Sequence, residues 1–363
     1  MNLDKALKEF DVFLQERRCS FVKDYIIKYD TYFKMGGNIK YFLTPLTTNE
    51  LISIIDYLKN NKLEYKIIGF TSNVILLDEI EYSIIISTKN LRRVVIEDNK
   101  ISVEAGYSLQ DLVRIAIMNQ VKGFEGLEGI PASIGGAVLM NAGAYGDTIS
   151  DNLLTVTCVD KNNNLVVLNN KDCNFSHRNS IFKKNEYIIL QATFKLIKGN
   201  RKEIATRVEK FHIARHSYQD FVYPNLGSML SIKGSVYHQI FKQDSVFYVR
   251  YWFLKLVYKN PIIKFINRKK PNNKIFNKLL LKYLFSKKEI KLDYTLSTKS
   301  SNILINDGML SVKDLIEYIF ILHNLAGENH NLENEIILHP VYSVNKDFIE
   351  DYQYIADRLK QIQ

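Results

Sequence analysis

The chain has 363 residues, of which 46% are hydrophobic and 24% charged, values typical of a globular protein long enough for two or three domains. It contains no apolar run of about 18 residues and no apolar stretch near its N-terminus, which argues against a membrane-spanning helix and a signal peptide. The net charge of +10 is unevenly distributed, because residues 239–291 contain 14 Lys and Arg but only 2 Asp and Glu.

Helical and extended patterns alternate through the N-terminal third of the chain. Apolar residues recur at spacings of three and four over residues 3–18, 51–58 and 109–119, which predicts three helices, the second capped by Thr47 or Thr48. Strands are predicted within residues 33–43, after a turn at Gly36-Gly37, and at residues 65–68, 74–77, 82–87, 93–96 and 101–105.

The later elements continue this mixture. They are a β-hairpin of residues 153–159 and 165–168, a strand at 187–195, and helices at 202–215, 311–327 and 347–359. Ser311 and Asp314 form the capping box of the second of these helices, and Gly327 ends it. Because strands and helices do not follow a strict strand–helix–strand rhythm, we expect the α+β fold class.

Residues 126–146 form an unusual glycine-rich run with six glycines, four alanines and one proline. This composition makes a poor helix and a poor strand, although apolar residues such as Ile130 and Ile134 distinguish it from a flexible linker. Glycine lets a backbone approach a ligand closely. The run therefore predicts ordered backbone packed against a flat or phosphorylated ligand.

A second loop, Gly69-Phe-Thr-Ser-Asn73, directly follows the predicted strand at 65–68. Backbone N–H groups in such a loop commonly bind phosphate, although the loop alone would also fit an ordinary turn. No Gly-x-Gly-x-x-Gly motif lies between a strand and a helix, which disfavours a Rossmann-type NAD dehydrogenase.

Both segments resemble the flavin-binding signatures of the UDP-N-acetylenolpyruvoylglucosamine reductase family. Ala132, Phe70 and Thr71 stand where glycine is usual or frequent in that family. The resemblance implies a two-subdomain FAD-binding fold of the vanillyl-alcohol-oxidase type plus a C-terminal α+β substrate domain. It implies that non-covalent FAD is bound by Gly69, Phe70, Thr71, Ser72, Asn73, Gly129, Ile130, Pro131, Ser133, Gly135, Gly136, Asn141, Gly143, Tyr145 and Gly146.

Three further segments resemble the catalytic motifs of the same family: residues 175–183, 215–228 and 332–336. The resemblance assigns catalytic roles to Arg178, Ser228 and Glu335, and substrate-binding roles to Arg215, Gln219 and Lys299. His177 replaces the usual tyrosine, and Ser300 replaces a histidine near Lys299. A second Gly-Ser pair, Gly234-Ser235, is the weaker candidate for the serine.

The implied reaction reduces the enolpyruvyl ether of UDP-N-acetylglucosamine to UDP-N-acetylmuramate, a peptidoglycan precursor. NADPH would first reduce FAD, and reduced FAD would then deliver hydride to the substrate. Arg178 would stabilise the charge that develops on the substrate carboxylate, and Glu335 would help through a proton or a bridging water. Ser228 would donate a proton as general acid. No metal is expected.

The predicted domains are two FAD-binding subdomains at 1–88 and 89–200, a substrate-binding domain at 201–345 and a C-terminal helix at 346–363. Within the third, the basic and aromatic segment 239–291 is longer than the family usually has. It suits either a helical hairpin with solvated lysines or a peripheral contact with an anionic membrane surface; nucleic acid is not an expected partner.

Two rival functions remain open. The first is a paralogous flavoprotein acting on another nucleotide sugar in capsule or surface polysaccharide synthesis, and the second is a degenerate homologue that binds or scaffolds. The sparse cysteines, Cys19, Cys158 and Cys173, lie too far apart for a metal or redox motif and predict a reducing compartment. We therefore expect a cytoplasmic protein, with membrane association as the open alternative.

Overall fold

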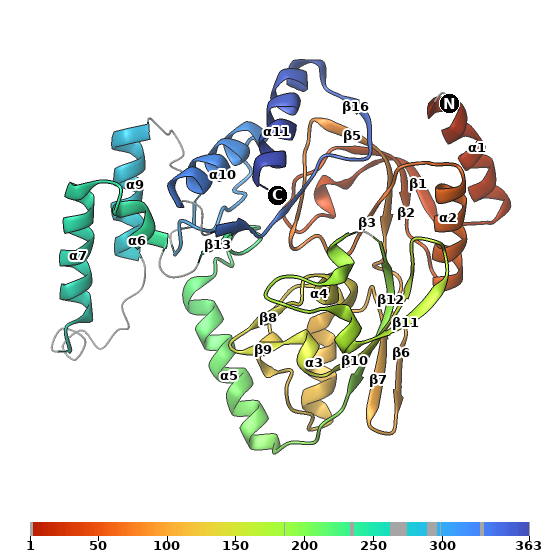
Figure 1. Cartoon of the computed structure of the whole chain (residues 1–363), viewed down its shortest axis with the longest axis horizontal. Helices are drawn as coiled ribbons and strands as arrows, with labels where there is room; N and C mark the ends of the chain where they lie inside the picture. The colour runs from red at the N-terminus through yellow and green to blue at the C-terminus, as the bar shows by residue number, and fades with distance from the viewer. Residues whose placement is uncertain are drawn as a thin grey trace.

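The computed structural model describes residues 3–184, 186–232, 236–261, 274–288, 296–297, 299–326 and 330–362. The main strands of this part form two five-stranded sheets, with helices beside each (Figure 1). The α+β class predicted from the sequence is confirmed. No helix among the described residues is long and apolar enough to cross a membrane.

The first sheet is organised around β5 (Ile80–Ser87). Strands β2 (Asn38–Leu43) and β3 (Lys66–Ile68) run parallel to β5, and β1 (Phe21–Ile26) is antiparallel to β2. Strand β16 (Val341–Val344) pairs antiparallel with β5. Residues 341–344, predicted to belong to the substrate domain, instead complete the first sheet. The division into domains stays a prediction.

Helices α1 (Leu3–Glu16) and α2 (Thr48–Asn60) lie beside this sheet and share one hydrophobic core with it (Figure 1). Their apolar stripes are buried as their spacing predicts, with Phe10 and Ile54 fully inaccessible. The N-cap of α2 is Thr47, whose side chain accepts a hydrogen bond from Glu50 N at 3.1 Å.

The second sheet is antiparallel throughout, in the order β11-β10-β12-β7-β6. The predicted hairpin is present as β10 (Leu153–Val159) and β11 (Leu165–Asn169). The other strands are β12 (Ile188–Lys195), β7 (Lys100–Glu104) and β6 (Val94–Glu97). Helix α3 (Leu109–Met118) packs into the same core.

The glycine-rich run contains a helix that its composition did not predict. Helix α4 (Ile134–Leu139) begins after Ser133, whose hydroxyl accepts a hydrogen bond from Gly136 N at 3.3 Å. It forms because Ile134, Ala137 and Val138 are buried against the second sheet, so that packing outweighs the low helix propensity of glycine. The expectation of neither helix nor strand was wrong here; β8 (Gly143–Ala144) and β9 (Asp147–Thr148) follow.

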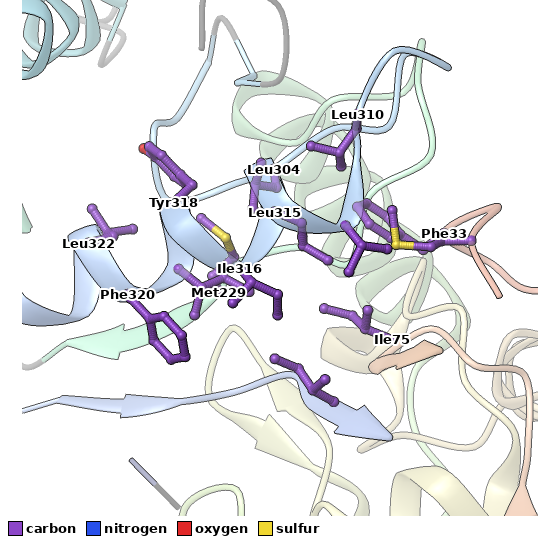
Figure 2. Packing of buried hydrophobic residues seen from close by; sticks show 14 of the residues in the cluster. Phe33, Ile75, Met229, Leu304, Leu310, Leu315, Ile316, Tyr318, Phe320 and Leu322 are labelled. Atoms are coloured by element: carbon purple, nitrogen blue, oxygen red, sulfur yellow. The ribbon is translucent and has the colours of Figure 1, made fainter. Parts of the chain in front are cut away.

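Helix α5 (Arg201–Tyr218) leaves the second sheet and leads to the C-terminal part of the chain. There α6 (Val236–Phe241), α7 (Ser245–Lys259), α9 (Lys274–Lys288), α10 (Val312–Ala326) and α11 (Ile349–Ile362) share one core with the first sheet. Figure 2 shows Met229, Leu304 and Leu315 packed towards Phe33 and Ile75 in this core. Gly327, the predicted end of α10, lies outside the described residues.

The remaining strands are short. Strand β13 (Leu230–Ile232) pairs with β14 (His330–Leu332), and β15 (Glu335–Ile337) runs parallel to β4 (Val74–Leu76). Short 3-10 helices cover Ile27–Tyr29, Glu125–Leu127, Ile149–Asp151, Asn170–Cys173, Ile181–Lys184 and Lys346–Phe348. The β15–β4 pairing brings the predicted catalytic glutamate directly beside the predicted phosphate loop.

Candidate active site

The two predicted cofactor segments meet in the structure. A methyl group placed on Gly69 would come within 2.2 Å of Ser133 Oγ, so only glycine lets the loop of residues 69–73 approach the glycine-rich run this closely. Among the described residues, no hydrogen bond is donated by the backbone N–H groups of residues 69–73. Unpaired N–H groups of this kind fit the pyrophosphate of a dinucleotide.

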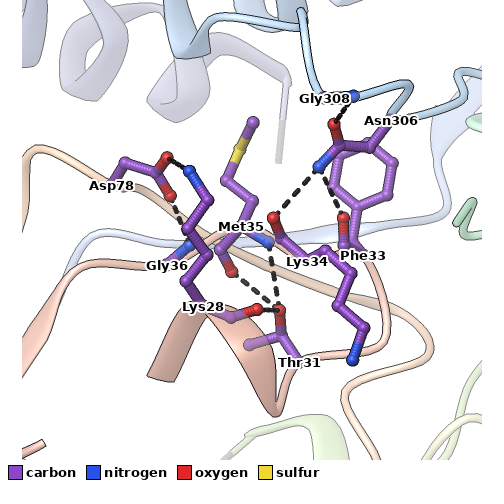
Figure 3. Close-up of polar contacts among 9 residues, drawn as sticks. All are labelled: Lys28, Thr31, Phe33, Lys34, Met35, Gly36, Asp78, Asn306 and Gly308. Atoms are coloured by element: carbon purple, nitrogen blue, oxygen red, sulfur yellow. Dashed lines mark hydrogen bonds and ion pairs between the residues drawn. The ribbon is translucent and has the colours of Figure 1, made fainter. Parts of the chain in front are cut away.

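Thr71 gives this loop its shape. Its φ of 56° lies in the left-handed region, and its hydroxyl accepts a hydrogen bond from Tyr32 N at 2.8 Å. The turn that carries Tyr32 is itself fixed, because Asn306 Nδ2 donates to the carbonyl oxygens of Phe33 and Lys34 at 2.8 and 3.0 Å (Figure 3). The position of the loop therefore depends on a residue of the C-terminal part.

A cleft with a volume of about 440 Å³ opens beside this loop. Gly69, Phe70 and Thr71 line one side, and the basic side chains Lys89 and Arg92 contribute to the rest. Apolar and aromatic walls with a few cationic groups suit an anionic ligand that carries a flat ring.

The glycine-rich run is shaped by residues in the left-handed region. The φ angles are 75° at Gly129, 93° at Gly146, 42° at Asn141 and 56° at Tyr145. Asn141 Nδ2 donates to Ser176 O at 3.0 Å, while its buried Oδ1 has no hydrogen-bond partner in the described part of the chain. The run is thereby connected to the segment that contains Arg178.

Arg215 is buried between Gly129 and Tyr145 and is only partly satisfied. It is 6% exposed, and neither Nε nor Nη2 has a hydrogen-bond partner among the residues that the structure describes. Its guanidinium lies 5.5 Å from the ring centre of Tyr145, whose hydroxyl is 3.1 Å from that of Tyr218. Burial, followed by the contact with Tyr218, raises the pKa of Tyr145 and keeps the phenol neutral. A buried cation with unpaired donors fits an anionic part of a ligand.

Arg178 is held by an acidic neighbour that the sequence analysis did not single out. Its Nη2 lies 3.5 Å from Glu333 Oε2, and the two side chains are 36% and 15% exposed. His177, the residue in place of the family's tyrosine, lies 3.4 Å from Ser231 through Nε2 and Oγ. The arginine segment therefore contacts the segments that carry the other two catalytic candidates.

Ser228 is exposed beside this ion pair, and no described residue hydrogen bonds to its hydroxyl. The next residue, Met229, is buried, donates to Asn302 O at 2.9 Å and accepts from Glu333 N at 2.8 Å. Because the backbone N–H and the carbonyl group of Met229 are both hydrogen bonded, the hydroxyl of Ser228 is exposed at a defined position. The alternative serine, Ser235, lies outside the described residues.

Glu335 is joined to the phosphate loop through Asn73. Glu335 N donates to Asn73 O at 2.9 Å, and Asn73 Nδ2 donates to Glu333 O at 2.8 Å. The carboxylate of Glu335 forms an ion pair with Lys66 Nζ. Arg178, Ser228 and Glu335 thus converge on residues 333–335, next to the loop with unpaired N–H groups.

Two predicted substrate-binding residues instead stabilise the end of α5. Lys299 Nζ donates to the carbonyl oxygens of His216 and Gln219 at 3.0 and 2.5 Å. A cation at a helix C-terminus is favourable because it satisfies carbonyl groups that have no partner within the helix. The substrate roles of Gln219 and Lys299 stay predictions.

Comparisons with known proteins bear on this geometry. A family model described as an FAD binding domain matches residues 39–169. UDP-N-acetylenolpyruvoylglucosamine reductase of Clostridium novyi (strain NT) is 31% identical over 308 residues, which cover 85% of this chain and 88% of that protein. The protein of the same name from Caldanaerobacter subterraneus is 35% identical over 226 residues, covering 62% of this chain and 72% of that protein.

The chain belongs to the UDP-N-acetylenolpyruvoylglucosamine reductase family. The family resemblance read from the sequence is confirmed. The crystal structure of UDP-N-acetylenolpyruvylglucosamine reductase from Thermus caldophilus superposes with a TM-score of 0.60 at 22% identity, covering 88% of this chain and 98% of that one. This match, with the FAD-domain model, confirms the predicted FAD-binding fold.

Ser300, where this chain departs from the reductase family pattern, has a local structural role. The carbonyl oxygen of Ser300 accepts from Ile303 N at 3.1 Å, and its hydroxyl accepts from Asn302 N at 3.3 Å. Ser300 therefore stabilises the turn that holds Met229, and through it the place of Ser228.

Lys66, Glu333 and Asn334 were not among the predicted site residues. Asn334 is 2% exposed and donates through Nδ2 to Asn73 Oδ1 at 3.1 Å. Glu333 lies within residues 332–336, the segment that resembles a catalytic motif, two residues before Glu335. Lys66 gave no local signal, because its partner is 269 residues away in the sequence.

Proposed function

We propose that this chain is an FAD-dependent reductase that uses NADPH to reduce the enolpyruvyl ether of UDP-N-acetylglucosamine to UDP-N-acetylmuramate. Membership of the reductase family supports the reaction class. The observation that carries the proposal is the convergence of Arg178, Ser228 and Glu335 on residues 333–335, beside a loop suited to a dinucleotide.

The residues present fit FAD. The unpaired N–H groups of residues 69–73 would hold its pyrophosphate, and the glycine-rich run, which touches the same loop, would cover its flat ring. When bound, FAD supplies the hydride that the protein side chains cannot.

Arg215 and Arg178 would bind different anionic groups. Arg215 is buried with two unpaired donors, so it would bind a charged group that enters from the cleft. Arg178 is more exposed and already near Glu333, so a substrate carboxylate would share it with that glutamate. Charge that develops on the substrate carboxylate during reduction is stabilised by this guanidinium.

Ser228 donates the proton that completes the reduction. Its hydroxyl has no competing partner among the described residues and would transfer its proton to the carbon that bears the ether oxygen. Glu335, held in place by Lys66 and by the backbone of Asn73, would act at the same place through a proton or a bridging water, because its bare carboxylate would repel the developing negative charge.

The test follows the flavin absorbance of the purified protein. NADPH should bleach the flavin bands under anaerobic conditions, and UDP-N-acetylglucosamine enolpyruvate should restore them. Ser228→Ala should still bleach but recover at least about 100-fold more slowly. Recovery at the wild-type rate in that variant, or with another UDP-sugar ether only, would contradict the assignment.

We also propose a cytoplasmic location and a peripheral membrane contact through residues 239–291. The three free cysteines, two of them buried, support a reducing compartment. The membrane contact depends on the exposed surface of α7.

A further inference from the structure

Helix α7 has two apolar faces, and only one of them is buried. Phe247 and Tyr251 are 6% and 3% exposed and pack on α6 and α9, with the ring centres of Phe247 and Tyr283 5.0 Å apart. The outer face carries four apolar side chains at spacings of three, four and three, which we name the α7 stripe: Val246, Val249, Phe253 and Leu256. They are 57%, 67%, 65% and 67% exposed.

The α7 stripe is held in a fixed position. Asp244 caps α7 by accepting hydrogen bonds from Val246 N and Phe247 N at 3.0 and 3.2 Å. Together with the buried inner face, this cap fixes which side chains point outward. An apolar row displayed on a fixed helix indicates an interaction surface rather than a solvated helix.

The positive charge around the α7 stripe indicates what kind of partner it binds. The described residues of the segment, 236–261 and 274–288, contain nine Lys and Arg and one acidic residue. Arg250 lies on one side of the stripe, and Trp252, which is 38% exposed, lies on the other side. The Nζ atom of Lys255 is 4.3 Å from the ring centre of Trp252. The partner must therefore accept apolar side chains and carry negative charge.

We propose that α7 docks this chain on the surface of an anionic lipid membrane. Aromatic and long basic side chains beside an apolar stripe are the features of a helix that lies in the membrane interface. A standard protein interface needs about 20–30 residues from each side, many more than the four of the stripe. A second copy of the chain would bring two strongly basic segments together, which is unfavourable.

The place of α7 in the molecule suits this role. Figure 1 shows it as the outermost described helix, with α6 and α9 between it and α10. A flat surface can reach the stripe without displacing either five-stranded sheet. This inference does not depend on the proposed reductase activity.

Trp252 provides a direct test, because it is the only tryptophan in the chain. We would add vesicles of equal parts phosphatidylglycerol and phosphatidylcholine to the full-length holoprotein, and vesicles of phosphatidylcholine alone in parallel. Only the anionic vesicles should shift the Trp252 fluorescence emission to shorter wavelength and protect Trp252 from an aqueous quencher. Only these vesicles should also carry the protein into the pellet on sedimentation. An unchanged emission with no sedimentation overturns the proposal.

A matched pair of variants identifies the surface. Phe253→Ser with Leu256→Ser should reduce the partition onto anionic vesicles by at least about tenfold. Leu165→Ser with Val167→Ser removes two side chains that are each 61% exposed on β11 and should leave it unchanged. Equal partition of both variants overturns the proposal, as does a monomer–dimer equilibrium that only the α7 variant abolishes.

Discussion

Lys66 Nζ lies 2.5 Å from Glu335 Oε1, and this ion pair joins β3 of the first sheet to β15 of the C-terminal segment. Strand β15 is held in the same place by its parallel pairing with β4, in which Glu335 lies opposite Val74. The ion pair therefore orients a carboxylate whose backbone is already fixed. Its value lies in positioning, because both side chains are partly exposed and such pairs add about 0–1 kcal/mol to stability.

Replacing Lys66 with Met should lower kcat about tenfold and change the melting temperature little, because the cation that orients Glu335 is lost while the strand pairing remains. Steady-state kinetics and thermal unfolding measure the two effects. Lys40→Met is the matched control: Lys40 also pairs with a glutamate, Glu81, at 3.2 Å in the same sheet, away from the candidate site. A Lys66 variant with wild-type kcat would show that the pair has no role in catalysis.

Asn73 connects the loop of residues 69–73 to residues 333–335. Asn73→Ala loses the hydrogen bonds to Glu333 O and from Asn334 Nδ2, both in a partly buried setting. We expect retention of FAD to weaken by up to about 30-fold, because each of the two hydrogen bonds contributes about 1 kcal/mol. Titration of FAD into the apoprotein measures it. Asn119→Ala, which removes one exposed helix-end hydrogen bond, should bind FAD normally; equal losses would contradict the assignment.

The sequence predicted most of the helices and strands but not the contacts that join them. The apolar stripes of α1 and α2 are predicted by the spacing of their residues alone. The candidate catalytic roles of Arg178, Ser228 and Glu335 are predicted by motifs. The pairing of Glu335 with Lys66 depends on the register of β15 against β4, which no local pattern records. Helix α4 was missed because burial of Ile134 and Val138 outweighs the low helix propensity of Gly135 and Gly136 only once the second sheet exists.

His323 on α10 makes stability depend on pH. Burial lowers its pKa below the ordinary value of 6.5, so the unfolded chain binds a proton more readily than the folded one. Stability from this group is therefore fully present above about pH 6.5 and decreases as pH falls towards the folded pKa. We expect the melting temperature of the wild type to fall more than that of His323→Gln between about pH 7.5 and pH 5.5. Parallel melting curves would contradict this role.

Gly129 allows the most specific test of the buried arginine. Its φ is 75°, and a methyl group there would lie 2.9 Å from Cδ and Nε of Arg215. Gly308 has a φ of 89° with no atom within 4 Å of such a methyl group. Gly129→Ala and Gly308→Ala therefore share a backbone cost of about 1–2 kcal/mol, and only the first displaces Arg215.

Both variants should melt at lower temperature, Gly129→Ala by the larger amount because it also displaces Arg215, but only Gly129→Ala should raise KM for the UDP-sugar, by about tenfold or more. The reason is that Arg215 holds two unpaired donors in one buried position, and a shift of its Cδ moves both away from the anionic group that they bind. If Gly308→Ala raises KM equally, the effect is general strain. If neither variant changes KM, Arg215 does not bind substrate.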